Sequence, residues 1–560
     1  MARRSQEAPA ALKIVPLPGQ WQAFRNGELA ASGLTAALAT AGAAVAPKEP
    51  AFLLQHPAEP SAPDLPALCD TIARALPAAA LPVTWLTGGA VRDALLGTPV
   101  HDLDYVTGSD ALKLARAVAR QLGADFYVLD EQRGAARVIV NTAGAPRVVV
   151  DFTRLRGPDI LSDLLLRDFT INSMAIAVAQ PALLLDPAGG EADLRAKLLR
   201  LTGAGAIADD AVRALRGVRL ANRLQLHIDK PARVAMRAAT PLLANCTAER
   251  VRDELFAVLG GARPAAALRV LDTLDLLGVC LPAIQPLKTA AMPAPQTGTQ
   301  WQHSLFVVER LASLLGVLGR AHDLDRASEF ALGFAAGRLG RFRDQITDRM
   351  EQELSPGRSV RALLMLAALL HACPEASIET DAQQLNIAGA AHARQDGNLV
   401  RRQAEALKIA GVETAFVQQA VLQHARPAQH YRIQAMTARE LHIYFRATKT
   451  VGLEVCLLAL ADMLAHAGAT LQQPEWIAAV DRSVEMFEAF HISHAVIVKP
   501  ERLLTGDEVM AALQLPQGRA LGLLLIGLSE AQAAGELTTK AAALEWVRLQ
   551  AQHSGISRSA

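Results

Sequence analysis

The sequence predicts an α+β protein in which a small mixed-sheet head is followed by an extended all-α neck, body and tail. Two observations lead to this prediction. Between residues 82 and 155, short β-rich runs alternate with segments of helical spacing, whereas after Asp163 apolar residues recur at spacings of three and four. Composition agrees, because the 560-residue chain is rich in alanine and leucine and only 4% aromatic, which favours helix.

The head is predicted to begin at Leu81. A short β-rich run leads into paired glycines, a segment of helical spacing follows, and a second strand comes after it. An amphipathic helix and three further strands complete this small α/β unit. In chain order the segments are VTWLTGG, AVRDALLG, HDLDYVTG, ALKLARAVARQLG, FYVLD, ARVIVN and RVVVDFT.

From Asp163 onward we expect helices throughout. No fixed repeat period occurs along this part of the chain, so a solenoid is not expected. The segments with helical periodicity are VRALRGVRLANRL, ERVRDELFAVLG, ALRVLDTLDLLG, SLFVVERLASLLG, RALLMLAALLHAC, GDEVMAALQL and AAALEWVRLQ.

Five parts follow from these changes of pattern. The first 80 residues hold 10 of the 29 prolines, which predicts an appendage and a Pro/Ala-rich linker that are partly disordered. The predicted parts are the appendage with its linker at 1–80, the head at 81–200, a helical neck at 201–290, a helical body at 291–495 and a C-terminal helical tail at 496–560.

Composition also limits the classes of function. The 56 Lys and Arg residues against 55 Asp and Glu residues leave a net charge of +1, so any surface for nucleic acid must be local. The five cysteines form no CxxC pair, which disfavours a disulfide scaffold or a zinc knuckle and fits a reducing cytosol. No uncharged apolar run reaches about 18 residues, and no apolar stretch follows the basic N-terminus. We therefore expect a cytoplasmic protein without membrane contact.

Two aspartates follow the paired glycines in a pattern that indicates metal chemistry. Asp102 and Asp104 lie two apart on a predicted strand, so their side chains point to the same face. Two carboxylates this close repel each other unless a cation lies between them, and Mg²⁺ prefers such oxygen ligands. Asp151, at the end of the strand run RVVVD, can complete a two-metal site. The alternative is that the aspartate pair caps a turn and Asp151 forms a surface ion pair.

Gly88 and Gly89 fit the same interpretation. A glycine pair lets backbone N–H groups approach a phosphate, and the helix that follows offers its N-terminus to that phosphate. Arg92, one turn into this helix, is placed to clamp a triphosphate.

Three segments in this order resemble the signatures of class II tRNA nucleotidyltransferases and bacterial poly(A) polymerases, which belong to the DNA polymerase beta nucleotidyltransferase superfamily. They are GGAVRDALLG with HDLDYVT, LRDFTINSMA at 166–175 and DDAVRALRGVRL at 209–220. ERVRDEL and residues 503–525 resemble later parts of the bacterial family. The resemblance implies a nucleotidyltransferase head that uses Mg²⁺, CTP and ATP, and a tRNA partner bound at its 3′ end and acceptor arm. It leaves the oligomeric state open.

The resemblance also implies a role for each matching residue. Asp102 and Asp104 hold Mg²⁺ and act as catalytic carboxylates together with Asp151. The residues implied in nucleotide binding are Gly88, Gly89 and Arg92 on the phosphates, Arg167, Asp168 and Asn172 on phosphate and sugar, Asp210 and Arg213 on the base, and Arg216 elsewhere on the nucleotide.

The assignment of Asp210 and Arg213 to the base has a physical basis. Cytosine and adenine share an edge with a ring-nitrogen acceptor beside an amine donor, and uracil and guanine show the reverse pattern. An arginine donor next to a carboxylate acceptor therefore accepts C and A, and a mismatched base leaves buried polar groups unpaired. Residues three apart share a face of a helix, so this pair can act together. An ordinary surface ion pair is the alternative.

RNA contacts are expected from the helical part, beginning with the neck. Residues 195–223 carry seven basic side chains against two acidic ones, enough to neutralise phosphates locally. We expect RNA to be recognised by shape and backbone more than by its bases, although a solvated helix face is the alternative. The basic residues are Arg195, Lys197, Arg200, Arg213, Arg216, Arg219 and Arg223.

A further resemblance lies in the body. WQHSLFVVERL, LLMLAALLHAC and LLALADMLAHAG resemble an HD-type domain, which holds metal through a His, an adjacent His-Asp pair and an Asp. His303, His371 and Asp462 match three of these residues, but Ala372 stands where the paired aspartate belongs. The resemblance therefore implies a degenerate HD-like region used for packing or RNA contact.

The sequence thus predicts a template-independent nucleotidyltransferase that adds CCA, or part of it, to tRNA 3′ ends by a two-metal mechanism and releases pyrophosphate. The nearest alternative is a poly(A) polymerase on the same scaffold. An HD phosphohydrolase is disfavoured by Ala372, and a catalytically inactive RNA-binding protein by the three carboxylates.

Overall fold

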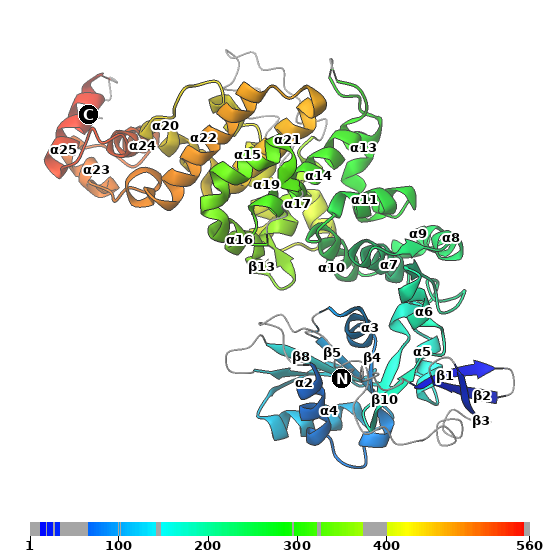
Figure 1. Cartoon of the computed structure of the whole chain (residues 1–560). Coiled ribbons are helices and arrows are strands. Elements are labelled where there is room, and N and C mark those ends of the chain that lie inside the picture. The colour runs from blue at the N-terminus through cyan, green and yellow to red at the C-terminus, as the bar shows by residue number, and fades with distance from the viewer. Residues whose placement is uncertain are drawn as a thin grey trace, which may run out of the picture. The chain divides into compact units, whose positions relative to one another are not determined.

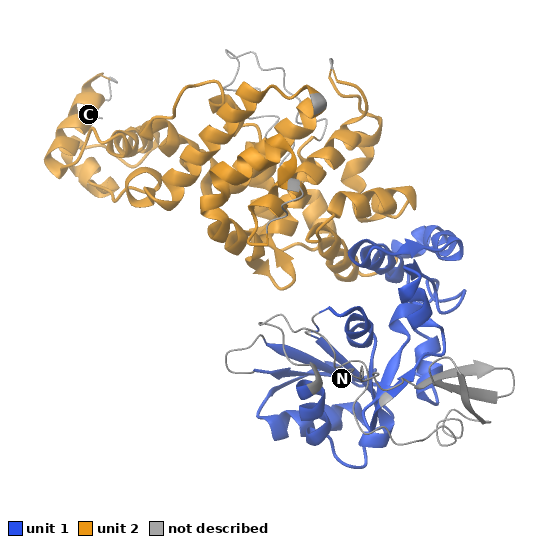
Figure 2. Ribbon diagram, in the orientation of Figure 1, with its two compact units in different colours: residues 1–244 blue, residues 245–560 orange. Residues whose placement is uncertain are grey.

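The structure is a computed structural model that describes residues 12–17, 20–25, 28–33, 65–98, 100, 102–141, 147–293, 296–321, 326–372 and 400–553. Its contacts divide the chain into two compact units, residues 1–244 and 245–560 (Figure 2). Most of the predicted Pro/Ala-rich linker lies outside the described residues, so its disorder stays a prediction. The five-part division likewise stays a prediction, because the two units cut the chain at a single point.

The first unit is built on one mixed sheet. Its strand order is β3-β2-β1-β10-β9-β4-β5-β8-β7-β6, which places β4, β5 and β8 at neighbouring positions inside the sheet. The strands predicted between residues 82 and 155 are all present. The bounds are β1 (Leu12–Leu17), β2 (Gln20–Arg25), β3 (Glu28–Gly33), β4 (Thr84–Thr87), β5 (Asp102–Thr107), β6 (Asp125–Asp130), β7 (Ala135–Val140), β8 (Val148–Arg154), β9 (Ala175–Ala177) and β10 (Gln180–Leu185).

Two of these strands correct the expectation of helices throughout the chain after Asp163. β9 pairs with β4, and β10 pairs with β9, so both belong to the central sheet. A short apolar run such as Ala182–Leu185 is compatible with a buried strand or with a helix, and periodicity alone cannot separate the two. The pairing partners decide between them, and two of these partners, β4 for β9 and β1 for β10, come from much earlier in the chain.

The helix α4 (Ala111–Leu122) shows why these segments fold as the pattern predicts. The Asp110 side chain accepts a hydrogen bond from the backbone of Lys113 at the N-terminus, and Gly123 ends the helix in the left-handed region at φ 62°. Leu114 and Val118 are buried, because this face of α4 packs on β7 and β8. Figure 1 shows α4 beside α2 (Leu65–Ala75), in agreement with their contacts.

The helix α7 (Val212–Leu224) packs tightly within the same unit. A Cβ atom on Gly217 would lie 2.3 Å from the Met236 side chain and 2.7 Å from the Phe169 ring, so only glycine fits here. The close approach brings the arginines of α7 next to the segment that begins with Arg167. The remaining elements of this unit are η2 (Leu81–Val83), α3 (Gly89–Leu96), α5 (Ile160–Leu165), η3 (Thr170–Asn172), α6 (Gly190–Arg195), β11 (Leu198–Leu199), β12 (His227–Ile228), α8 (Lys230–Ala238) and α9 (Thr240–Leu243).

The second unit is helical, as predicted. α14, α17 and α21 pack on one another, and the middle of each helix is buried. A short hairpin, β13 (Glu353–Ser355) with β14 (Arg358–Ser359), is the exception among its described residues. The larger helices are α10 (Ala248–Leu259), α11 (Pro264–Thr273), α14 (Gln300–Leu318), α15 (Phe330–Leu339), α16 (Arg343–Glu351), α17 (Val360–Leu370), α19 (Gly411–Gln423), α20 (Ala438–Thr448), α21 (Gly452–Ala467), α22 (Gln473–His491), α23 (Gly506–Leu513), α24 (Arg519–Ala533) and α25 (Lys540–His553).

The stretch Ala438–Ala467, which runs through α20 and α21, is long and apolar enough to cross a membrane by length and composition alone. More than half of its most apolar window is buried inside the second unit. Its acidic residues have partners there, since Glu454 pairs with Arg349 and Asp462 with His303. These contacts are those of a core helix.

Candidate active site

The two aspartates of β5 lie on one face of the sheet, as the alternation of the strand predicts. Leu103 between them is buried, whereas Asp102 and Asp104 are exposed. β5 runs parallel to β8, and the register sets Asp104 directly opposite Asp151. The parallel pairing therefore brings the third predicted carboxylate next to the pair, although it lies 47 positions later in the sequence than Asp104.

The surroundings of Asp104 make its ionised form unfavourable. It opens to solvent through a pocket, and protein groups surround it on its other sides. This burial, followed by the negative charge of Asp151, raises the pKa of Asp104 to about 6, although Arg167 acts in the opposite direction. The ionised form is therefore costly unless a cation is bound, which is the electrostatic signature of a metal ligand.

Asp151 has a partner that the sequence did not reveal. Arg137 on β7 donates from Nε to Oδ1 at 2.8 Å and from Nη2 to Oδ2 at 2.9 Å, so both carboxylate oxygens are engaged. The hydrogen bonds to Asp151 raise the pKa of Arg137 further, so the guanidinium is a permanent cation beside the carboxylates. Each oxygen of Asp151 keeps a second lone pair, so the carboxylate can still bind a metal while Arg137 fixes its orientation.

The glycine turn at the end of β4 lies against these groups. Gly88 has a φ of 69°, in the left-handed region that favours glycine. A Cβ atom there would lie 3.2 Å from Nη1 of Arg167 and 3.5 Å from Oδ2 of Asp104. Gly89 then begins α3. The turn thus needs glycine both for its backbone conformation and for the close approach of two charged side chains.

A pocket of about 320 Å³ opens beside this turn. Six arginines and two aspartates line it together with both glycines, so the lining is strongly positive and suits a polyanion. Asp102, Asp151 and Asp210 are not among the lining residues. The residues around the pocket are Gly88, Gly89, Arg92, Asp104, Arg156, Arg167, Asp168, Asn172, Arg213, Arg216, Arg219 and Leu220.

A chain of hydrogen bonds connects the three sequence motifs across this pocket. Arg92 donates to Oδ1 of Asn172, and Asn172 donates to Oδ1 of Asp168 at 3.0 Å. Arg216 of α7 donates to Oδ2 of the same aspartate at 3.3 Å. Asp93 extends this set of contacts, because its Oδ1 accepts a hydrogen bond from Nε of Arg92 at 2.7 Å. The predicted nucleotide-binding residues are therefore fixed relative to one another.

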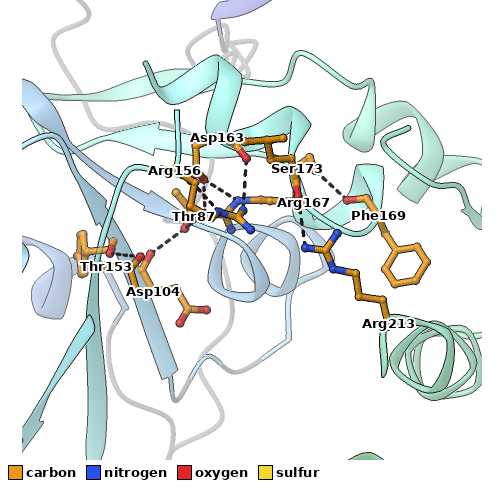
Figure 3. A network of polar contacts seen from close by, with 11 residues as sticks. Thr87, Asp104, Thr153, Arg156, Asp163, Arg167, Phe169, Ser173 and Arg213 are labelled. Atoms are coloured by element: carbon orange, nitrogen blue, oxygen red, sulfur yellow. Dashed lines mark hydrogen bonds and ion pairs between the residues drawn. The ribbon is translucent and has the colours of Figure 1, made fainter. Parts of the chain in front are cut away.

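Asp210 and Arg213 are close, but not for the reason expected from the sequence. Asp210 precedes α7 rather than lying on it, and a turn with a hydrogen bond from Arg213 N to Asp210 O brings the residues together. Nε of Arg213 lies 3.9 Å from Oδ2 of Asp210. Arg213 also donates to the carbonyl oxygens of Ala206 and Leu166, and Figure 3 shows the Arg213 side chain at the edge of the network.

The sequence analysis missed several residues of this site. It expected Arg219 to contact RNA, yet Arg219 lines the pocket, and its spacing of three from Arg216 was a signal that could have placed it there. Arg156, Arg137 and Asp163 carry no such signal, because each acts through a partner that only the fold brings near. Asp163 is 1% exposed and lies between Arg156 and Arg167 (Figure 3).

A second polar cluster lies in the helical unit. His303, His371 and Asp462 come from α14, the end of α17 and α21, and their ligand atoms all lie within 4.8 Å of one another. Among the described residues, this cluster meets that distance and the three aspartates of the head do not. Nε2 of His303 donates to Oδ1 of Asp462 at 2.8 Å, and Nδ1 of His371 donates to the carbonyl of Ala368. The structure therefore brings together the three residues that the HD-type resemblance implied.

Comparisons with known proteins agree with this fold. The chain matches the poly A polymerase head domain over residues 84–200 and the probable RNA and SrmB-binding site of polymerase A over residues 225–288. A CC-adding tRNA nucleotidyltransferase of Geobacter sulfurreducens is 34% identical over 465 residues, which is 83% of this chain and 91% of that protein. An A-adding tRNA nucleotidyltransferase of Deinococcus radiodurans is 30% identical over 480 residues, covering 84% of this chain and 96% of the relative.

A solved structure is similar as well. A CCA-adding enzyme in complex with ATP has a TM-score of 0.55 at 18% identity, covering 87% of this chain and 96% of the other, which supports a common fold. The fold and the head match therefore define the chain as a nucleotidyltransferase with a poly A polymerase head. More particularly, the identity over most of both chains shows that it belongs to the tRNA nucleotidyltransferase family, whose members depend on a metal ion.

Proposed function

We propose that this chain adds CCA, or part of it, to the 3′ end of tRNA from CTP and ATP without a template, and releases pyrophosphate. One observation carries the proposal. The parallel register of β5 and β8 sets Asp104 opposite Asp151, with Asp102 on the same face of β5. The arginine-lined pocket opens next to these carboxylates, so a nucleoside triphosphate bound there has its phosphates beside them.

The donor set fits magnesium. Asp102 and Asp104 offer carboxylate oxygens on one strand face, and the raised pKa of Asp104 reflects burial and negative neighbours that a cation relieves. We propose Asp102 and Asp104 as the residues that hold Mg²⁺, with Asp151 as the third catalytic carboxylate. When bound, the ion stabilises negative charge on the reacting phosphate and lowers the pKa of the attacking hydroxyl.

The residues of this chain bind and orient the substrates. Gly88 and Gly89 allow the backbone to approach the phosphates, and Arg92 and Arg167 supply positive charge next to them. Asp168, Asn172 and Arg216 form the hydrogen-bonded network that fixes the sugar and the neighbouring phosphate in place. Holding the triphosphate and the 3′ hydroxyl in one geometry supplies a large part of the rate enhancement.

Base selection is proposed for Arg213 with Asp210. Arg213 lines the pocket and is held by two backbone carbonyls, so its guanidinium has a fixed orientation. A donor and an acceptor about 4 Å apart match the shared edge of C and A and mismatch U and G.

The relatives named CC-adding and A-adding act on tRNA, and we propose the same partner here, with the acceptor arm contacted by the helical neck at 201–290. We also propose that the enzyme works in the cytoplasm, where its substrates are found. A poly(A) polymerase is the second candidate, since the head matches the poly A polymerase model.

The test is a gel assay with a tRNA that lacks its 3′ end. The tRNA is incubated with each of the four NTPs separately and then with CTP plus ATP. We expect extension by up to two residues with CTP, by one residue after a C-ended substrate with ATP, or by both, and then termination. Unlimited growth with ATP on any RNA supports the poly(A) polymerase instead. No extension with CTP or ATP rejects both proposals.

A further inference from the structure

One carboxylate in the head has no place in the chemistry described so far. Asp163, in the last turn of α5, is 1% exposed, and such a group is retained only with strong partners. Its Oδ1 accepts from the backbone N–H and from Nε of Arg156, both at 3.1 Å. Its Oδ2 accepts from Nε and Nη2 of Arg167 at 3.2 and 3.0 Å. A single carboxylate thus holds two arginines.

Electrostatics agrees with this geometry. Burial alone raises the pKa of Asp163, but the charges of Arg167 and Arg156 outweigh burial, and the net pKa lies below its ordinary value. The carboxylate is therefore ionised at neutral pH. Two guanidinium groups against one carboxylate leave the trio with a net positive charge, and both arginines line the pocket.

The two arginines reach this position from different segments of the chain. Arg167 follows α5, and its Nη2 also donates to Oγ1 of Thr87 at 3.1 Å, which places it against the glycine turn. Arg156 follows β8, and its side chain is about half exposed, so its guanidinium keeps free surface toward the pocket. Three other pocket arginines have separate anchors, which are Asp93 for Arg92, Asp168 for Arg216 and two backbone carbonyls for Arg213.

We propose that Arg156 binds the pyrophosphate portion of the incoming nucleotide, and that Asp163 is the positioning residue that holds Arg156 and Arg167 as a two-arginine clamp. The proposal rests on the proposed function, because it takes the phosphate that reacts to lie at Asp104. The phosphates beyond it then lie along the glycine turn, where Arg167 is fixed. Paired guanidinium groups in a set geometry suit such phosphate oxygens.

The first experiment measures ATP and AMP binding by calorimetry with Mg²⁺ and without tRNA. We expect Arg156→Ala to weaken ATP binding about tenfold, which corresponds to about 1.4 kcal/mol, and to leave AMP binding within about twofold. Arg154→Ala is the matched control, because Arg154 is also exposed and lies two residues earlier at the end of β8, yet does not line the pocket. Equal weakening of ATP and AMP binding, or ATP binding as tight as in the wild type, would overturn the proposal.

The second experiment tests the positioning role of Asp163. Asp163→Asn keeps the shape and removes the charge, so it should raise KM for CTP and ATP about tenfold, with KM for tRNA unchanged. Combined with Arg156→Ala, it should add far less than the sum of the single effects, since both act through one clamp. Additive effects on KM would overturn the role.

A third variant serves as the control for effects on stability. Glu454→Gln removes another buried carboxylate that pairs with an arginine, Arg349, in the second unit. Both substitutions should lower the unfolding temperature, but only Asp163→Asn should change nucleotide KM. If Asp163→Asn does not fold, Arg156→Ala and its control still decide the triphosphate contact.

The proposed function fails by a different result. If Asp104→Ala keeps its turnover, the active site itself is misassigned. If Asp104→Ala is inactive while Arg156→Ala binds ATP normally, the clamp alone is wrong.

Discussion

At the scale of single residues, Asp102 and Asp104 differ from the aspartates that hold the structure together. Neither side chain fills the core, whereas Asp163, Asp186 and Asp193 are buried. We therefore expect Asp102→Ala and Asp104→Ala each to abolish nucleotide addition while the unfolding temperature stays within a few degrees of wild type. Turnover is measured on tRNA that lacks its 3′ end, and unfolding by calorimetry. Near-wild-type turnover in either variant would contradict the two-metal site.

The pKa of Asp104 gives a prediction in pH. Since it lies at about 6, the group is protonated below that pH and cannot hold a cation, so addition should fall as pH drops through 6. A higher Mg²⁺ concentration should shift this fall in activity to lower pH, because the metal ion competes with the proton for Asp104. Asp151 is itself a proposed catalytic carboxylate, so Asp151→Asn is studied by NMR titration of the metal-free protein, where the loss of a negative neighbour should lower the pKa of Asp104. A pH profile that does not respond to Mg²⁺, together with an unchanged pKa in Asp151→Asn, would show that another group titrates.

The same shift affects stability. The folded pKa of Asp104 is above the unfolded value of 3.8, so its contribution to metal-free stability is fully present below about pH 4. That contribution is lost as pH rises through 6. Ionised Asp104 therefore lowers the stability of the metal-free protein at the pH where the enzyme is active.

At the scale of elements, we propose that Arg213 at the start of α7, together with Asp210 just before it, selects the base. We expect incorporation from CTP and ATP and refusal of UTP and GTP. Arg213→Ala should relax this choice as well as lower the rate, because the donor that rejects U and G is gone. Competition assays with all four NTPs on one tRNA measure the selectivity. Full selectivity in the variant would place the base-reading residue elsewhere in the helical part.

The junction of α14, α17 and α21 leads to a negative prediction. His303, His371 and Asp462 come together, but Ala372 cannot supply the carboxylate that bridges two metals. We expect no hydrolysis of 2′,3′-cyclic nucleotides or nucleoside phosphates with Mg²⁺, Mn²⁺ or Ni²⁺.

The control for that assay is Asp102→Ala, which disables only the head. Hydrolysis that survives in this variant and is lost in His371→Ala would show that the helical unit is a second active site. His371 is 3% exposed, so the folding of its variant must be checked by calorimetry.

At the scale of the whole molecule, the basic segment 195–223 is less positive than its sequence indicates. Acidic residues outside the segment fold back onto it. The ion pairs are Arg195 with Glu191, Arg200 with Asp193, Arg216 with Asp168 and Arg223 with Asp93. A count along the sequence missed these partners, because it stopped at the ends of the window.

These pairs predict a shallow salt dependence. If all seven basic residues met phosphate, log K for tRNA against log salt would have a slope of about −5 or steeper. We expect about −3 or shallower, because several of the seven already neutralise an aspartate or glutamate. Filter binding between 50 and 200 mM salt, at fixed Mg²⁺, measures the slope. A value near −5 would mean that the internal pairs open when tRNA binds.

The sequence was sufficient for the order of strands and helices between 82 and 155 and for the carboxylates of β5, because these depend on local periodicity. It was insufficient for β9 and β10, whose identity as strands is decided by their neighbours in the sheet. It was also insufficient for Arg137 and Arg156, since each gains a role from a partner on another segment. Sequence motifs therefore predict the candidate catalytic residues, whereas their hydrogen-bond partners become visible only in the folded structure.

The ion pairs of α7 set a limit on how this enzyme can be recombined with its relatives. The matched head model ends at residue 200, which looks like a natural place to join two chains. Yet Asp93 accepts a hydrogen bond from Arg223, and Asp168 accepts one from Arg216, so α7 is bound to residues that precede position 200. A chimera joined at 200 separates both pairs, whereas one joined near 244 inherits them intact. The part of this enzyme that can be exchanged as one piece is therefore longer than the matched head model.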